Sequence, residues 1–321
     1  MLFSVIIPLY NKTAYVAKAI HSVLAQSFSD YELVIVDDGS KDDSVNVAAK
    51  VVEGRDCCRI IRQENAGVSM ARNKGVAVST GDYLCFLDAD DWWEPTFLEE
   101  LSNLIKEFPE AGIYGANYTI VNETKHKTRV APLGMGKDFK KGYINYCQVY
   151  AKTLAMPLTS ISVAIPRKVF DEMKGFPKGI KLGEDFMLWI HIALKYKVAF
   201  LNKPLAYYNQ DVDAANRGVG HLYQPYEHML WNLTDLEPHE KTNEDYKKLI
   251  DRMRVNGLLK YYASSEYHLF AKEELAKVNW DDDELKHVGL YRLPRLLVKL
   301  IIDIGRFGSQ AKQLIINRRL R

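Results

Sequence analysis

The first ninety residues alternate between short apolar runs and segments in which apolar residues recur at helical spacing. The apolar runs have the length and composition of buried strands and lie at Phe3–Pro8, Tyr31–Asp37, Arg59–Arg62 and Tyr83–Leu87. The intervening segments predict helices over 13–24, Ser44–Val52 and Val68–Val78. Strands that alternate with helices form right-handed βαβ units, so the pattern predicts a mainly parallel sheet flanked by helices.

The pattern changes in the second half of the chain. Gly112–Val121 predicts a further pair of strands, and the polar residues 122–142 predict a loop. A last strand over Val198–Leu201 is expected to end before Pro204, because proline cannot donate a hydrogen bond to a neighbouring strand. From about residue 214 onward only helical patterns remain.

These patterns divide the chain into an α/β domain over residues 1–213 and a helical region over residues 214–321. Apolar residues make up 47% of the 321 residues, which is enough for a large core and an appendage. The net charge of +2 gives no indication of a nucleic-acid partner, but the charge is unevenly distributed. Residues 289–321 contain eight Lys or Arg and one acid, Asp303, so this tail carries +7 and the rest of the chain −5.

Cysteine usage and the lengths of the apolar runs bear on location. The four cysteines show no metal-ligand spacing, and the adjacent pair Cys57 and Cys58 is poorly placed to form a disulfide. No apolar run reaches the length of a membrane-spanning helix, and no basic leader precedes the first strand. We therefore expect a cytoplasmic protein in a reducing compartment.

Three carboxylates follow the fourth predicted strand, at Asp88, Asp90 and Asp91. An open α/β sheet binds its ligands at the carboxyl ends of its strands. Asp88 and Asp90 are two residues apart, so in an extended chain their side chains leave the same face and repel each other, which favours a divalent cation. Bound Mg²⁺ or Mn²⁺ would attract phosphate oxygens. The alternatives are a solvated acidic loop and, for Asp91, a helix cap.

Acids or amides also follow other predicted strands, in Asp37–Ser40 and Asn65–Gly67. No glycine-rich dinucleotide motif and no P-loop motif occurs, so neither of those nucleotide folds is indicated. Polar groups at the ends of successive strands are nevertheless typical of a nucleotide cleft.

Five motifs, in order and spacing, resemble those of family 2 glycosyltransferases of the GT-A fold. They are Val5–Asn11 (VIIPLYN), Val36–Ser40 (VDDGS), Asn65–Asn73 (NAGVSMARN), Phe86–Asp91 (FLDADD) and Gly183–Asp185 (GED). The resemblance covers roughly residues 3–210 and does not reach the last hundred residues. It implies a Rossmann-like fold and an inverting, Mn²⁺- or Mg²⁺-dependent enzyme of glycan or polysaccharide biosynthesis. Such an enzyme moves a sugar from a nucleotide-diphosphate donor, here expected to be a UDP-sugar, to an acceptor hydroxyl.

The resemblance assigns the nucleotide end of the site to four residues. Asp38 is expected to hydrogen-bond the base, and Pro8 and Tyr10 are expected to form the wall that packs on it. Arg72 is expected to contact the nucleotide or the diphosphate, for which its planar fork of donors is suited. The alternatives are a turn at Asp38 and a surface ion pair at Arg72.

At the reacting end, the resemblance implies Asp88 as a contact of the ribose and the metal shell, and Asp90 as the direct metal ligand. Asp185 is expected to be the general base, with a pKa raised by Glu184 and by partial burial. For Glu184 and Asp185 the alternative is that two acids favour the start of a helix.

Other parts of the expected site stay open. Trp92, Trp93 and Glu184 are candidate contacts of the acceptor. The indoles can stack on a sugar, although one of them is expected in the core. No third protein ligand of the metal is evident, and His191 is a candidate that can equally pack on its own helix. Many family members carry Arg or His near a tyrosine pair where this chain has Tyr207–Asp211, so the role of that segment is open.

In the basic tail, residues 289–321, apolar Leu, Ile and Phe outnumber the charges. A basic amphipathic helix lies well in a lipid interface that holds anionic headgroups. Binding of this kind would make the protein peripheral at the inner face of the membrane and favour a lipid-linked acceptor. The alternative is a helix docked on the catalytic domain.

Two other functions compete with sugar transfer. A catalytically silent nucleotide-sugar-binding module has no need of Asp88, Asp90 and Asp185 together. A sugar nucleotidyltransferase would carry a glycine-rich basic loop after the first strand, where this chain has Leu9–Lys12. Both are therefore less favoured than an enzyme that transfers a sugar.

Overall fold

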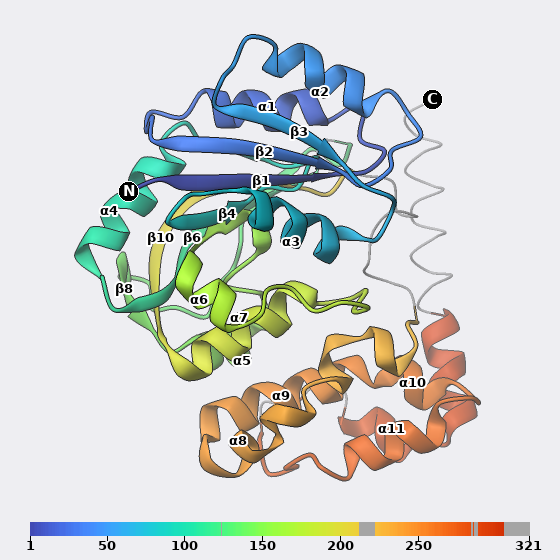
Figure 1. Cartoon of the computed structure of the whole chain (residues 1–321). Helices are drawn as coiled ribbons and strands as arrows, with labels where there is room; N and C mark the ends of the chain where they lie inside the picture. The colour runs from blue at the N-terminus through green and yellow to red at the C-terminus, as the bar shows by residue number, and fades with distance from the viewer. Residues whose placement is uncertain (123, 212–221, 284, 286–287, 305–321) are drawn as a thin grey trace. The chain divides into compact units, whose positions relative to one another are not determined.

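The structure is a computed structural model that describes residues 1–122, 124–211, 222–283, 285 and 288–304. In Figure 1 the strands gather into one sheet with helices beside it. The α/β class that the sequence predicts is therefore confirmed.

The first half of the sheet is parallel and follows the predicted alternation. Its strands are β1 (Phe3–Leu9), β2 (Tyr31–Asp37), β3 (Cys58–Arg62) and β4 (Tyr83–Phe86). The helices between them are α1 (Val16–Leu24), α2 (Ser44–Val52) and α3 (Val68–Val78). Because β1 pairs in parallel with β2 and β4, and β2 with β3, the carboxyl ends of these strands lie at one edge of the sheet.

Strand β1 buries both of its faces. On one face, Ile7 belongs to the same apolar core as Ile20 of α1. On the other face, Ile6 meets α3, where a Cβ atom on Gly75 would lie 2.5 Å from Cγ2 of Ile6. Glycine at this position lets α3 approach the sheet closely. This close approach sets the depth of Arg72, which precedes Gly75 by almost one helical turn.

The second half of the sheet is mixed. Its strands are β5 (Trp92–Trp93), β6 (Ala111–Asn122), β7 (Lys127–Val130), β8 (Lys141–Ile144), β9 (Val163–Pro166) and β10 (Lys197–Asn209). β6 and β10 are parallel, whereas β9 runs antiparallel to both β4 and β6 and joins the two halves. The strand order is β3-β2-β1-β4-β9-β6-β10-β5, with β7 beside β6 and β8 beside β10.

Three expectations for this half are wrong. Gly112–Val121, predicted as a pair of strands, is part of the single strand β6, and residues 122–142 contain β7 and the start of β8. Strand β10 continues through Pro204 instead of ending before it, and its register against β6 shifts on both sides of the proline. Such irregularities accommodate a residue that has no N–H to donate.

Further helices among residues 1–236 are α4 (Phe97–Glu107), α5 (Tyr146–Thr153), α6 (Arg167–Glu172) and α7 (Glu184–Lys195). Short 3₁₀ helices are η1 (Ser160–Ser162), η3 (Pro225–Glu227), η4 (Met229–Trp231) and η5 (Thr234–Leu236). Gly183 precedes α7 with a φ of +80°, in the left-handed region that glycine adopts without strain. Glu184 and Asp185 are therefore the first two residues of α7.

The chain divides into two compact units, Met1–Leu236 and Glu237–Arg321. The predicted boundary at residue 213 falls within 212–221, outside the described residues. The second unit is helical, as expected, and contains α8 (Glu237–Thr242), α9 (Glu244–Gly257), α10 (Leu259–Ala263), α11 (His268–Leu275), η6 (Val288–Arg292) and a helix over residues 295–304. In the described part of the chain, no helix combines the length and the apolar character that a bilayer span requires.

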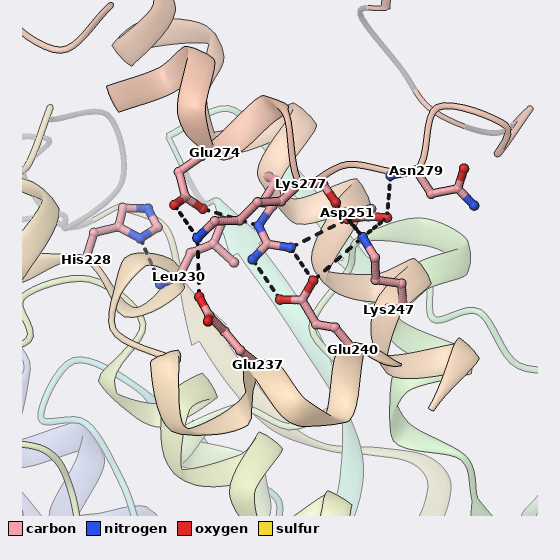
Figure 2. A network of polar contacts seen from close by, with 10 residues as sticks. His228, Leu230, Glu237, Glu240, Lys247, Asp251, Glu274, Lys277 and Asn279 are labelled. Atoms are coloured by element: carbon pink, nitrogen blue, oxygen red, sulfur yellow. Dashed lines mark hydrogen bonds and ion pairs between the residues drawn. The ribbon is translucent and has the colours of Figure 1, made fainter. Parts of the chain in front are cut away.

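A network of ion pairs ties α8, α9 and α11 of the second unit together (Figure 2). Arg254 donates to both carboxylate oxygens of Glu240, at 2.6 and 2.7 Å, and its Nε lies 3.4 Å from Glu274. Lys277 pairs with Glu274 and with Glu237 (Figure 2). Burial by itself would lower the pKa of Arg254, but these carboxylates outweigh it and raise the pKa, so the buried guanidinium stays charged.

Candidate active site

A cavity of about 790 Å³ opens in the first unit at the carboxyl ends of β1 and β2 and beyond the end of β4. It is lined by eight of the ten predicted site residues, namely Pro8, Tyr10, Asp38, Arg72, Asp88, Asp90, Glu184 and Asp185. Six of them come from the first ninety residues, whereas Glu184 and Asp185 come from the first turn of α7. The residues assigned to the nucleotide, the metal and the base therefore share one cavity.

The two tryptophans take other positions. Trp93 is buried, stacks on Phe97 and donates from Nε1 to the carbonyl of Ile161 at 2.6 Å. It is the indole expected in the core, and its burial leaves no face for an acceptor. Trp92 is partly exposed and stacks on Tyr207. Neither indole is among the described residues that line the cavity.

Asp88, Asp90 and Asp91 follow β4 in a tight turn, in which the N–H of Asp91 donates to the carbonyl of Asp88 at 3.0 Å. Asp90 forms an ion pair with the ammonium group of Lys12 at 2.6 Å. Burial raises the pKa of Asp90, Lys12 lowers it, and the negative charge of Asp88 raises it. The buried Asp91 accepts from the N–H of Asn209 at 2.7 Å, so it ties the turn to the end of β10 rather than capping a helix.

The Arg72 side chain bridges Asp88, which follows β4, and Glu184, at the start of α7. Its side chain is buried, with Nη2 donating to Asp88 at 2.7 Å and Nη1 donating to Glu184 at 2.9 Å. Burial by itself would lower the pKa of Arg72, but the two carboxylates outweigh it and raise the pKa. The guanidinium carbon also lies 5.1 Å from the centre of the Phe176 ring. The alternative of a surface ion pair is therefore wrong.

Asp185 has the electrostatic properties of a general base. Loss of hydration raises the pKa of Asp185 to about 7; the negative charge of Glu184 raises it too, whereas Arg72 and the N–H of Phe186 lower it. The N–H of Phe186 donates to Oδ1 at 2.7 Å, and the hydroxyl of Ser160 lies 3.4 Å from Oδ2. A carboxylate with a pKa near neutrality can accept a proton from a reacting group at physiological pH.

Asp38 is held by the chain itself. Its Oδ1 accepts from the Gln63 amide and the Ala66 N–H, each at 2.8 Å, and its Oδ2 accepts from the Gly67 N–H at 2.9 Å. These bonds fix the loop that leads into α3, which agrees with the alternative of a turn. Carboxylate oxygens can accept more than one hydrogen bond, so contact with a ligand is still available to Asp38. Tyr10 forms an exposed part of the wall.

Sequence reasoning missed a further part of the lining, which includes Lys12, Met156, Lys181, Leu182, His228 and Met229. Leu182 pairs with His228 in a parallel bridge, and the N–H of Met229 donates to the carbonyl of Leu182 at 3.0 Å. Burial lowers the pKa of His228 to about 4, so its imidazole is neutral at pH 7. His228 and Met229 lie outside every motif, because they reach the cavity through tertiary pairing with Leu182, beside the GED motif.

Asp88 and Asp90 fit a hard divalent cation. Carboxylate oxygens are the ligands that Mg²⁺ and Mn²⁺ prefer. A bound cation would stabilise the ionised form of Asp90 and so offset the effect of burial, which raises the pKa of Asp90. Within the described ranges, no three His, Cys, Asp or Glu side chains are grouped to hold a metal ion by themselves. His191, the candidate third ligand, contacts Asp235 at 2.8 Å and the carbonyl of Met187 instead. A metal ion here would therefore depend on oxygen atoms from a ligand or from water.

Comparison with known proteins agrees with this geometry. The family model described as "Glycosyl transferase family 2" matches residues 4–172. "Glycosyltransferase GlyA" of Streptococcus pneumoniae is 34% identical over 213 residues, which are 64% of this chain and 30% of that protein. An "Uncharacterized glycosyltransferase" of Rickettsia felis is 30% identical over 203 residues, 63% of this chain and 32% of that protein. The chain thus spans about a third of the length of these two curated relatives.

Among solved structures, the crystal structure of residues 1–349 of S. aureus TarS in complex with UDP-GlcNAc is similar to this chain. The TM-score is 0.70 at 21% sequence identity, and the match covers 86% of this chain and 80% of the TarS chain. At this level of identity the similarity establishes the fold, and it confirms the GT-A architecture expected from the sequence.

Replacing Arg72 by methionine is expected to lower the free energy of unfolding by about 3 kcal/mol, because Asp88 and Glu184 are left without their shared cation. Urea unfolding at pH 7.5 measures the change. Lys141→Met is the matched control, since it removes an exposed ion pair with Glu107 and should cost under about 1 kcal/mol. Equal losses in the two variants would contradict a structural role for the buried bridge.

Proposed function

The chain belongs to glycosyl transferase family 2, and on that premise we propose that it transfers a sugar from a nucleotide-diphosphate donor to an acceptor hydroxyl. One observation carries the proposal. A single cavity holds a carboxylate pair suited to the cation of a diphosphate, and also a carboxylate, Asp185, whose pKa is about 7. The first group suits a leaving pyrophosphate, and the second suits an incoming alcohol.

Asp185 acts as the general base in this proposal. The acceptor oxygen attacks the anomeric carbon and gives its proton to the Asp185 carboxylate, while the bond from the anomeric carbon to the phosphate oxygen breaks. The nucleoside diphosphate leaves with the electron pair of that bond. A single displacement of this kind inverts the anomeric centre and needs one base and no carboxylate nucleophile.

Asp88 and Asp90 would hold Mn²⁺ or Mg²⁺ at the diphosphate end. When bound, the ion would supply Lewis-acid stabilisation of the negative charge on the leaving group. Lys12 already places a positive charge at Asp90, so we infer that Lys12 and the metal ion compete for this carboxylate. Arg72, in the same lining, donates to both Asp88 and Glu184 and so keeps them in place.

A uridine diphosphate sugar is the proposed donor. Pro8 and Tyr10 offer a wall for the base, and Asp38 lies on the same lining. The UDP-GlcNAc complex of the structurally similar TarS supports a UDP-sugar for this chain as well. The acceptor is proposed to be a hydroxyl of a growing glycan, with Glu184 next to Asp185 as a candidate contact.

A panel of nucleotide sugars with Mn²⁺, scored by donor hydrolysis and thermal shift, tests this function. UDP-sugars are expected to stabilise the protein and to be hydrolysed slowly. Asp185→Asn should reduce transfer by about 10²–10⁴-fold while donor binding changes little, because only proton removal is lost. Asp90→Ala should weaken both donor binding and transfer.

The control for these variants is Asp171→Asn, the same exchange at an exposed aspartate of α6 outside the cavity lining. It should leave donor binding and transfer unchanged. A panel without binding or hydrolysis of any donor would overturn the proposed function. Full transfer by Asp185→Asn would overturn only the assignment of the base.

The pH dependence of transfer follows from the raised pKa of Asp185. The base must be ionised, so kcat/KM should fall about tenfold per pH unit below pH 7 and level off above it. Glu184→Gln removes a negative charge that raises the pKa of Asp185, so the inflection should move to lower pH. The same exchange at the exposed Glu172 should leave the profile in place, and an upward shift for Glu184→Gln would refute this electrostatic coupling.

Removal of the Lys12 charge should tighten metal binding when no donor is present. Lys12→Met is expected to lower the Kd for Mn²⁺ about threefold to fivefold, because Asp90 loses its competing cation. Electron paramagnetic resonance of free Mn²⁺ measures this without any turnover. Lys41→Met removes an exposed positive charge nearby and should change the Kd less. Unchanged or weaker Mn²⁺ binding to Lys12→Met would exclude the competition.

A further inference from the structure

The helix over residues 295–304 in the second unit exposes an unusually apolar face. Five aliphatic side chains on it are between 44% and 68% exposed: Leu296, Leu297, Leu300, Ile301 and Ile304. Val298 on the same helix is fully buried. The helix is thus held by one side, while large apolar side chains on another side face solvent.

The five exposed side chains form a continuous stripe. At 3.6 residues per turn, their positions fall within an arc of about 140° of the helix circumference, and Val298 lies outside that arc. We call this stripe the aliphatic face. A contiguous apolar face of this kind is rare on a protein surface unless it contacts something else.

The charges along this helix and just before it are mostly positive. Arg292, Arg295 and Lys299 lie on or just before the helix, and Asp303 is the only acid of residues 289–321. This tail carries +7 while the rest of the chain carries −5. A positively charged segment that also exposes an aliphatic face favours a partner that is both negatively charged and apolar.

We propose that the aliphatic face lies in the interface of an anionic lipid bilayer, with the helix parallel to the membrane and its Arg and Lys side chains at the headgroups. Amphipathic helices with Leu or Ile on one side and cations on the other bind membranes in this way. The helix enters the interface without crossing the bilayer.

The side-chain chemistry of the face favours lipid over a protein partner. Cores of protein–protein interfaces are enriched in aromatic residues and Met, whereas this face consists of Leu and Ile alone. Lipid acyl chains are fluid and adapt to an apolar surface, so aliphatic side chains can bind them without a complementary shape. The inference does not rest on the proposed sugar transfer, because vesicle binding is measured without donor or acceptor.

Co-flotation of the full chain with phosphatidylcholine vesicles, with and without about 30% phosphatidylglycerol, tests the proposal. The protein should float with the anionic vesicles and bind neutral ones more weakly. Leu297→Glu with Leu300→Glu should reduce binding at least about tenfold, because charges replace two apolar contacts. Arg292→Gln with Lys299→Gln should reduce binding to anionic vesicles several-fold and lower its salt dependence.

Leu269→Glu is the matched control, since Leu269 is a more exposed leucine on α11 of the same unit and lies outside the aliphatic face. It should bind vesicles as the unaltered chain does. Failure of the unaltered chain to bind anionic vesicles, or equal losses in the control and the Leu297/Leu300 variant, would overturn the proposal. So would a dimer, seen by light scattering without vesicles, that the Leu297/Leu300 variant abolishes, because the face would then bind a second copy.

Discussion

Arg72 donates to Asp88, which follows β4, and to Glu184 at the start of α7, so two carboxylates far apart in the sequence depend on one buried guanidinium for their charge balance. A guanidinium is the side chain that can satisfy two carboxylates in fixed directions at once. Its depth depends in turn on Gly75, which lets α3 lie close to β1. Asp88 and Glu184, the neighbour of the proposed base Asp185, are thereby positioned by a common cation.

The first half of the fold could be predicted from the sequence because its apolar periodicity is local. The predicted strands and helices up to β4 differ from the observed ones by few residues, since each is bounded by its own turn residues. Strand β10 could not be predicted in the same way. Pro204 normally ends a strand, but the long pairing with β6 on both sides of it carries the strand past the proline.

The candidate site was likewise predictable only in part. The motif residues Asp38, Arg72, Asp88, Asp90 and Asp185 could be placed in one cavity from the resemblance alone, and the structure brings them together. His228 and Met229 could not, because they reach the cavity only through the bridge to Leu182. Trp92 and Trp93 are adjacent and identical, so the sequence does not show which of them is buried. The structure shows that it is Trp93.

Gly183 connects these two parts of the site. A Cβ atom at this position would lie 2.2 Å from Cγ of Met229, and the backbone there is left-handed. The space that Met229 fills is therefore the space of an absent side chain, so the GED motif shapes the cavity as well as supplying its acids. A substrate that required a pocket of different size would have to be accommodated by a substitution at Met229, because any side chain at Gly183 would clash with its neighbours.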